Sequence, residues 1–273
     1  MTQVSIDLMP STSPVSYFPT ADEIEIFSAA AQQKLAVMLK GPTGCGKTRF
    51  VEYMAQQLGR PLITIPCHED LTAADLVGRY LLKGGETVWE DGPMTRAVKL
   101  GAICYLDEVV EARSDTTVVI HPLTDHRREL HIDRLNQTLN VPDDFMVVVS
   151  YNPGYQSVLK DLKESTRQRM VGIDFDYPGA EVETNILVCE TGLNESVCLD
   201  LVKLAGAIRR LDSSGLSEAA STRTIVATAR LINGGVSPRR AAIACIASAL
   251  SDDLEIIAGL SEMIDNYLPE SLR

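Results

Sequence analysis

The sequence predicts an α/β core with a parallel sheet, followed by an all-helical unit. Short apolar runs, such as residues 35–39 and 62–66, alternate with helical stretches through the first part of the chain. A glycine-rich loop joins the first of these runs to a helix, as in parallel strand–helix units. From Pro178 onward the apolar period is helical throughout. We therefore expect an α/β unit over residues 1–178 and a helical unit over residues 179–273.

The length, composition and net charge of the chain exclude some classes of protein. With 273 residues, of which 45% are hydrophobic, the chain can bury a large core. The formal net charge of −12 argues against nucleic-acid binding, which relies on Lys and Arg. No window approaches the ~20 apolar residues of a membrane span, and the first residues lack a basic stretch before an apolar run. We expect a cytoplasmic protein that binds neither nucleic acid nor membranes.

The residue types that often bind metals do not have metal-site spacings. The six cysteines are scattered without a C-x-x-C pair, so we expect reduced thiols rather than a zinc site or disulfides. The histidines His121, His126 and His131 are five apart. On a helix this spacing rotates each by about 140° from the last, which disfavours a shared metal ion.

Residues 41–48 match the phosphate-binding pattern G-x-x-x-x-G-K-[ST], which a strand precedes and a helix follows. They are Gly41, Pro42, Thr43, Gly44, Cys45, Gly46, Lys47 and Thr48. Backbone N–H groups and a helix N-terminus can meet the negative charge of a triphosphate. Lys47 would reach the terminal phosphates, and the Thr48 hydroxyl would ligate a bridging Mg²⁺. We interpret Cys45 as a passive filler rather than a reactive thiol.

Two carboxylates follow the apolar run at residues 103–106, at the expected C-terminal edge of a buried strand. Asp107 would hold the Mg²⁺ shell, and Glu108 would orient and deprotonate the attacking water. An acidic pair at a strand end is a weak signal alone, but here it follows a phosphate loop. Asn152 ends the next strand, residues 145–151, and could hydrogen-bond that water or the γ-phosphate. The alternative is that Asn152 only begins a turn before Pro153.

Three arginines are candidates for contacts with the nucleotide. Arg167 and Arg169 end a charged helical piece over residues 160–170, far along the chain from the phosphate loop. They could serve a neighbouring subunit as an arginine finger. Arg223 lies in the first turn of a helix, where a cation opposes the helix dipole and a phosphate could compensate it.

The remaining segments give coarser expectations. We predict an irregular arm over residues 1–20, a helix over 22–33, and helical pieces over 73–99 around the bending tip Lys83-Gly84-Gly85. That tip is either a plain loop or a contact for a protein substrate. We also predict a helix over 113–128 broken near Pro122, a β-hairpin over 129–141, a strand over 171–175, and a last helix that begins at Ser251.

This order of parts resembles an AAA+ ATPase, and the insert before the Asp-Glu strand and the later hairpin resemble its MoxR branch. Seven segments are similar to the CbbQ/NorQ family, and most of all to CbbQ. They read GPTGCGKTRFVEYMA, DLVGRYLL, GAICYLDEVVEAR, DTTVVIHPLTDHRR, SYNPGYQS, LKESTRQRM and DFDYP. The similarity runs from about residue 15 to the end and is strongest over residues 39–178.

The resemblance implies a five-stranded parallel sheet in the order 5-1-4-3-2 and a C-terminal helical lid. It implies Walker A at Lys47 and Thr48, Walker B at Asp107 and Glu108, and sensor 1 at Asn152. It favours Arg169 over Arg167 as the finger, because Arg169 takes the place of the arginine in the family's Q-R-F, although Met170 replaces the Phe. Arg223 would be sensor 2, with Arg239 as a rival.

By the same resemblance the protein binds ATP and Mg²⁺, forms a homo-hexameric ring and works with a CbbO-like von Willebrand factor A domain adaptor. The implied target is inhibited rubisco, from which ATP hydrolysis would release tight-binding sugar phosphates. A NorQ-like role in nitric oxide reductase maturation is the alternative. Two other classes stay open: a low-turnover nucleotide switch or scaffold, which has less need of Glu108, and a metabolic P-loop kinase, for which no acceptor pocket is evident.

Overall fold

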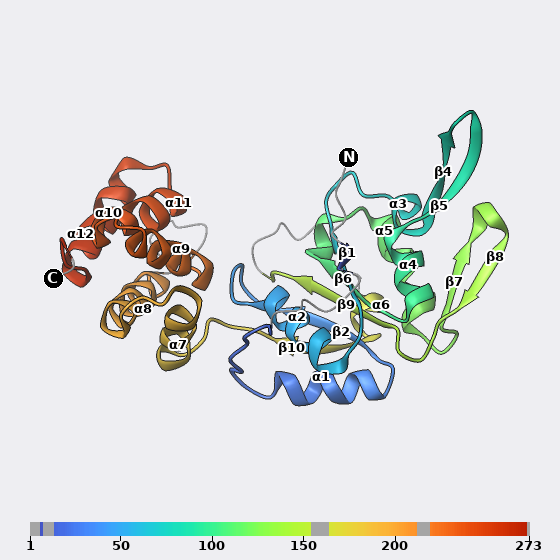
Figure 1. Cartoon of the computed structure of the whole chain (residues 1–273), viewed down its shortest axis with the longest axis horizontal. Coiled ribbons are helices and arrows are strands. Elements are labelled where there is room, and N and C mark those ends of the chain that lie inside the picture. The colour runs from blue at the N-terminus through green and yellow to red at the C-terminus, as the bar shows by residue number, and fades with distance from the viewer. Residues whose placement is uncertain (1–5, 8–13, 154–163, 212–218, 272–273) are drawn as a thin grey trace. The chain divides into compact units, whose positions relative to one another are not determined.

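The protein was analysed as a computed structural model, which describes residues 6–7, 14–153, 164–211 and 219–271 (Figure 1). By its contacts the chain divides into two compact units. Unit 1 comprises residues 1–41 and 47–175, and unit 2 comprises residues 42–46 and 176–273. The glycine loop therefore groups with the C-terminal part of the chain. Among the described residues, no helix is both long and apolar enough to cross a bilayer.

Unit 1 is built on a sheet with five parallel strands. They are β2 (Ala36–Lys40), β3 (Leu62–Pro66), β6 (Ile103–Asp107), β9 (Met146–Tyr151) and β10 (Met170–Asp174). The sheet order is β1-β3-β6-β9-β2-β10, so the parallel strands numbered along the chain lie in the predicted order 5-1-4-3-2. The short strand β1 (Ile6–Asp7) pairs antiparallel with β3, which corrects the expected irregular arm at those two residues.

The strands are nearly continuous apolar runs because helices cover both faces of the sheet. Met38, Cys104 and Val147 pack into one cluster with α3 (Ala73–Val77), α4 (Pro93–Leu100) and α5 (Ser114–Thr124). The alternate residues Val37 and Leu39 are also fully buried. The helices α1 (Glu23–Gln32) and α2 (Lys47–Leu58) contact strands β2, β10 and β6. Pro122 lies inside α5 rather than breaking it.

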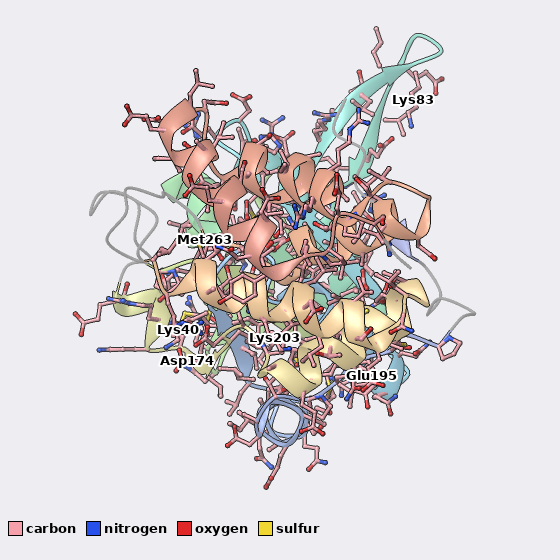
Figure 2. All side chains as sticks on the ribbon, turned by 90° about the vertical axis from the view of Figure 1, so that its left-hand side faces the viewer. Lys40, Lys83, Asp174, Glu195, Lys203 and Met263 are labelled. Atoms are coloured by element: carbon pink, nitrogen blue, oxygen red, sulfur yellow. The ribbon has the colours of Figure 1, made fainter. Side chains whose placement is uncertain are left out.

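The expectation of helical pieces over residues 73–99 is correct for α3 and α4 and wrong between them. Strands β4 (Gly78–Lys83) and β5 (Glu86–Asp91) form an antiparallel hairpin. Gly84 and Gly85 both have positive φ, 62° and 89°, which a two-residue hairpin turn requires. The tyrosine and tryptophan rings of the cross-strand pair Tyr80 and Trp89 lie 5.2 Å apart. Figure 2 shows Lys83 near the far end of this hairpin.

The later segments of unit 1 follow the predictions closely. The predicted hairpin is confirmed as β7 (Glu129–Ile132) and β8 (Gln137–Asn140). Of the charged helical piece, α6 (Glu164–Arg167) is described, while residues 160–163 lie outside the described part of the chain. Lys40 and Asp174, labelled in Figure 2, pair across β2 and β10 and form an ion pair of 2.8 Å.

In unit 2 the described secondary structure is helical. Its helices are α7 (Ala180–Thr191), α8 (Glu195–Arg209), α9 (Thr222–Asn233), α10 (Pro238–Ala242), α11 (Ser248–Leu250) and α12 (Leu254–Tyr267), with a π-helical turn over Ile243–Ala247. Leu201, Leu204 and Ile208 of α8 belong to one buried cluster. Ser221 caps α9 by accepting from the Thr224 N–H. Asp253 rather than Ser251 caps α12, because its carboxylate accepts from the Glu255 N–H.

All six cysteines are free thiols. Four are buried, Cys245 is half-buried, and Cys189 on α7 is exposed. Burial, with the charges of Asp107 and Glu108, raises the pKa of Cys67 to about 12. Burial also raises the pKa of Cys104 and of Cys198. Exposure favours thiol reactivity, and Cys189 is the most exposed of the six thiols.

We expect Gly92→Ala to destabilise unit 1, because a Cβ at Gly92 would lie 2.2 Å from the Leu76 carbonyl oxygen. Overpacking of this kind costs about 1–3 kcal/mol. The matched control is Gly172→Ala, whose Cβ would meet only the flexible end of Lys40 at 3.2 Å. The urea midpoint, followed by fluorescence of the single tryptophan Trp89, should fall for the first variant only. Equal midpoints for the two variants would contradict the tight approach at Gly92.

Candidate functional site

The ammonium of Lys47 lies at the start of α2 and is almost completely buried. Its Nζ donates to the Gly41 carbonyl at 2.8 Å and to Asn152 Oδ1 at 2.7 Å. Asn152 directly follows β9, which pairs with β2, the strand that leads into the glycine loop. The sheet order thus brings together two predicted site residues that are 105 positions apart.

The hydroxyl of Thr48 lies beside the carboxylate of Asp107. Thr48 Oγ1 is 3.4 Å from Asp107 Oδ2 and 3.3 Å from the Tyr105 phenol oxygen. A hydroxyl and a carboxylate oxygen at this separation are the kinds of ligand that Mg²⁺ accepts. Both predicted metal ligands therefore lie together at the C-terminal edge of the sheet.

Two further residues that the sequence analysis did not single out hold Asp107 in place. Its Oδ1 accepts from the Tyr105 phenol at 2.7 Å and from the Ser150 hydroxyl at 2.6 Å. Burial and the Asp107 charge raise the pKa of Tyr105, so this phenol remains a proton donor. A signal existed for both: Tyr105 shares a strand face with Asp107, and Ser150 interrupts an apolar strand.

Glu108 has an unusual backbone conformation. Its φ of 56° and ψ of 49° lie in the left-handed region, which costs an L-residue about 1–2 kcal/mol. Two hydrogen bonds stabilise this conformation: the Glu108 N–H donates to Ser150 Oγ at 3.0 Å, and the Glu108 carbonyl accepts from the Glu111 N–H at 2.8 Å. The Glu108 side chain is exposed. Strain of this kind is common at functional sites.

The glycine loop is tightly packed. A Cβ at Gly41 would lie 2.3 Å from the Phe175 carbonyl, and one at Gly44 would lie 2.7 Å from the Ser221 hydroxyl. Gly44 also has a φ of +71°. The Tyr177 phenol donates to the Thr43 carbonyl at 3.2 Å. Cys45 is buried, as expected of a filler.

The two rival arginines of unit 2 have different surroundings. The Arg239 guanidinium donates to the Leu268 carbonyl at 2.9 Å and forms an ion pair of 3.2 Å with Asp265, which ties α10 to α12. Arg223 is exposed, and its Cβ lies 3.3 Å from where a Cβ on Gly44 would stand. Within the described ranges, the Arg223 guanidinium donates no hydrogen bond and forms no ion pair. The local geometry therefore leaves Arg223 rather than Arg239 available beside the loop.

Arg167 ends α6, and Arg169 follows it by two residues. Arg167 is half-buried, while Arg169 is exposed. The Arg169 guanidinium donates to the Ser165 carbonyl. In the described part of the chain, no carboxylate pairs with Arg169.

The residues present fit a nucleotide with Mg²⁺ better than a protein-caged metal. Among the described residues there is no group of three or more His, Cys, Asp or Glu that could hold an ion. His121 and His131 are hydrogen-bonded to Thr166 and Thr138 instead. Mg²⁺ typically takes one or two protein ligands and fills its shell with phosphates and water. A cavity of about 390 Å³ at the base of the β4–β5 hairpin is lined by none of the predicted site residues.

Comparisons with known proteins identify the family of the chain. Residues 36–170 match the AAA domain (dynein-related subfamily), and residues 183–267 match the CbbQ/NirQ/NorQ C-terminal domain. Protein NorQ of Paracoccus denitrificans is 57% identical over 90% of this chain and 92% of its own length. The denitrification regulatory protein NirQ of Pseudomonas aeruginosa is 56% identical, covering 92% of this chain and 97% of its own. Protein CbbQ of Hydrogenophilus thermoluteolus is 54% identical, covering 88% and 90%.

Solved structures share the fold at low sequence identity. A putative ATPase from Cytophaga hutchinsonii has a TM-score of 0.50 and 18% identity, covering 91% of this chain and 82% of its own. A RuvB variant from Thermotoga maritima has a TM-score of 0.52 and 14% identity, covering 87% and 66%. Together with the close relatives, these matches mean that the chain is an AAA+ ATPase of the chaperone type and belongs to the CbbQ/NirQ/NorQ family.

Proposed function

We propose that the protein is a cytoplasmic motor that binds MgATP at residues 41–48 and uses its hydrolysis to remodel inhibited rubisco. The observation that carries the ATP site is the meeting of Lys47 with Asn152 beside the Thr48 and Asp107 pair. In this reading Lys47 exchanges its present oxygen acceptors for phosphate oxygens. Asn152 is then released to hydrogen-bond the attacking water or the γ-phosphate.

Thr48 and Asp107 would hold the Mg²⁺, which neutralises charge on the phosphates when bound. Tyr105 and Ser150 keep the Asp107 carboxylate in place through their hydrogen bonds. Glu108 is the proposed general base, because its exposed carboxylate follows the metal-linked Asp107 directly. Its strained backbone, fixed by Ser150, sets the direction of the side chain.

We expect Glu108→Gln to retain ATP binding while turnover falls by roughly 10²-fold or more, the usual scale of losing a general base. Steady-state phosphate release and equilibrium nucleotide binding, measured on the same preparation, check this. Asp70→Asn is the matched control, since Asp70 is an exposed carboxylate after the neighbouring strand β3. Unchanged turnover in Glu108→Gln would remove Glu108 from the mechanism and favour the low-turnover switch for the native protein.

We further propose a homo-hexameric ring in which Arg169 completes the site of the next subunit. Its exposed guanidinium contacts a backbone carbonyl of the preceding helix α6, which leaves it accessible to a neighbour. Arg167 is the alternative, although its side chain is half-buried. Arg223 is the proposed sensor 2, because it is exposed beside Gly44, whereas Arg239 forms an ion pair with Asp265.

Mixing two inactive variants tests this arrangement. Lys47→Ala protomers keep their fingers, and Arg169→Ala protomers keep their nucleotide site. If Arg169 acts in trans, randomly mixed rings should recover about one quarter of native turnover, because one interface in four has both groups intact. Native mass spectrometry would verify that the rings are mixed. No recovery in verified mixed rings would rule out Arg169 as a trans finger.

The client is proposed from the relatives, whose identities of 57% for NorQ and 54% for CbbQ do not separate the two roles. The CbbQ-like segments favour rubisco with a CbbO-like von Willebrand factor A domain adaptor. The β4–β5 hairpin is a candidate for client contact, because Leu82 is 77% exposed at its end. The β7–β8 hairpin is the second candidate, since the Tyr80 phenol reaches the carbonyl of Arg134 between its strands at 3.5 Å.

We expect the protein, with its adaptor and ATP, to restore carboxylation to rubisco closed on ribulose bisphosphate. The Glu108→Gln variant with the same adaptor is the control, since it should bind ATP without turning it over. Carboxylation rate before and after addition is the measurement. Failure with rubisco, together with activation of immature nitric oxide reductase, would transfer the assignment to the NorQ-like role.

A further inference from the structure

Unit 2 contains a buried polar cluster that the proposed ATPase mechanism does not use. At its centre is Glu183 on α7, whose side chain is fully buried. Its two carboxylate oxygens accept from the Arg209 guanidinium at 2.8 and 2.7 Å. The Thr222 hydroxyl donates to the same carboxylate at 2.6 Å. Glu183 is therefore satisfied by three donors from α8 and α9.

The Arg209 guanidinium is also engaged on its other sides. Its Nε donates to the Ala220 carbonyl at 2.7 Å, and its central carbon lies 4.0 Å from the centre of the Tyr177 ring. The second contact is a cation–π interaction. A buried ion pair contributes little net stability compared with apolar side chains of similar size. Its presence is better explained by the groups that it holds in position.

Those groups include two neighbours of the glycine loop. Tyr177, under Arg209, donates its phenol hydrogen to the Thr43 carbonyl at 3.2 Å. Ser221, adjacent to Thr222, packs so closely on Gly44 that a Cβ there would lie 2.7 Å from its hydroxyl. One ion pair thus supports both contacts with consecutive loop residues.

The Tyr177 contact has a direct effect on the phosphate-facing side of the loop. In a trans peptide the C=O and the following N–H point in opposite directions. Fixing the Thr43 carbonyl toward Tyr177 therefore fixes the Gly44 N–H on the opposite side. It also keeps a partial negative charge turned away from bound phosphates.

We propose that Glu183 and Arg209 are positioning residues that, through Tyr177 and Thr222, hold residues 43–44 ready for ATP. The inference rests on the proposed function, since it assumes that the loop binds ATP. ATP affinity is then set partly by a buried ion pair of the helical unit.

Tyr177→Phe tests the contact, because it removes the hydroxyl that donates to Thr43 and keeps the ring under Arg209. Loss of one hydrogen bond should weaken ATP binding by about 3–10-fold. We expect kcat at saturating ATP and the melting temperature to remain close to native, so that the change is in KM. Tyr267→Phe is the matched control in the same unit, since the Tyr267 hydroxyl makes no hydrogen bond with the described part of the chain.

A second pair of variants tests the ion pair. Single removal of either charge risks unfolding, so the double variant Glu183→Leu with Arg209→Met replaces both by apolar side chains of similar volume. Circular dichroism should show native helix content while ATP affinity falls at least as much as in Tyr177→Phe. The measurement for all variants is titration with a fluorescent ATP analogue.

The outcomes are distinguishable. A native protein that does not bind the analogue would refute the proposed ATP site itself. If the native protein binds the analogue, and Tyr177→Phe and the folded double variant both bind it with affinities within two-fold of the native value, the positioning role is overturned. An affinity loss that appears only together with a matching loss of thermal stability would also overturn it, because the cluster would then be purely structural.

Discussion

The carboxylate of Asp107 ends a buried strand, and a charged group there is stable only if donors surround it. The Tyr105 and Ser150 hydroxyls and the Thr48 side chain meet this need from β6, β9 and α2. These contacts require β6 to lie beside β9 and the glycine loop to deliver α2 to the same edge. The sheet order and the position of Ser150 are therefore both needed to stabilise this one carboxylate, and Ser150 also accepts from the Glu108 N–H.

Much of the fold and site could be predicted because each site segment is a short run of neighbouring residues with a recognisable pattern. The eight loop residues, the Asp-Glu pair and Asn152 are each marked by a local pattern at a strand end. Parallel strands present their C-terminal ends at one edge, so these patterns also predict proximity. The contact of Lys47 with Asn152 agrees with that reasoning. The order of the five parallel strands was implied by the family resemblance instead, and the sheet has that order.

The parts that were missed depend on contacts distant in sequence. Tyr105 and Ser150 can be noticed in the sequence as a residue on the Asp107 face and as a polar residue in an apolar strand, but their shared contact with Asp107 appears only when β6 and β9 are paired. The β4–β5 hairpin was expected to be helical because the spacing of its leucines is compatible with a helix as well as with a strand. The Gly84-Gly85 turn and the cross-strand pair of Tyr80 and Trp89 instead favour two strands. The rival arginines Arg223 and Arg239 have similar local sequences. Their contacts distinguish them: Arg239 is bound to Leu268 and Asp265, whereas Arg223 lies beside Gly44.

The exposed thiol of Cys189 and the single tryptophan, Trp89, allow each unit to be followed by its own optical signal. Cys189, in unit 2, is the exposed thiol, and burial makes Cys67, Cys104 and Cys198 poor nucleophiles. The single tryptophan, Trp89, belongs to unit 1. A dye coupled to Cys189 would therefore label unit 2, while the fluorescence of Trp89 reports on unit 1, without any substitution in the chain.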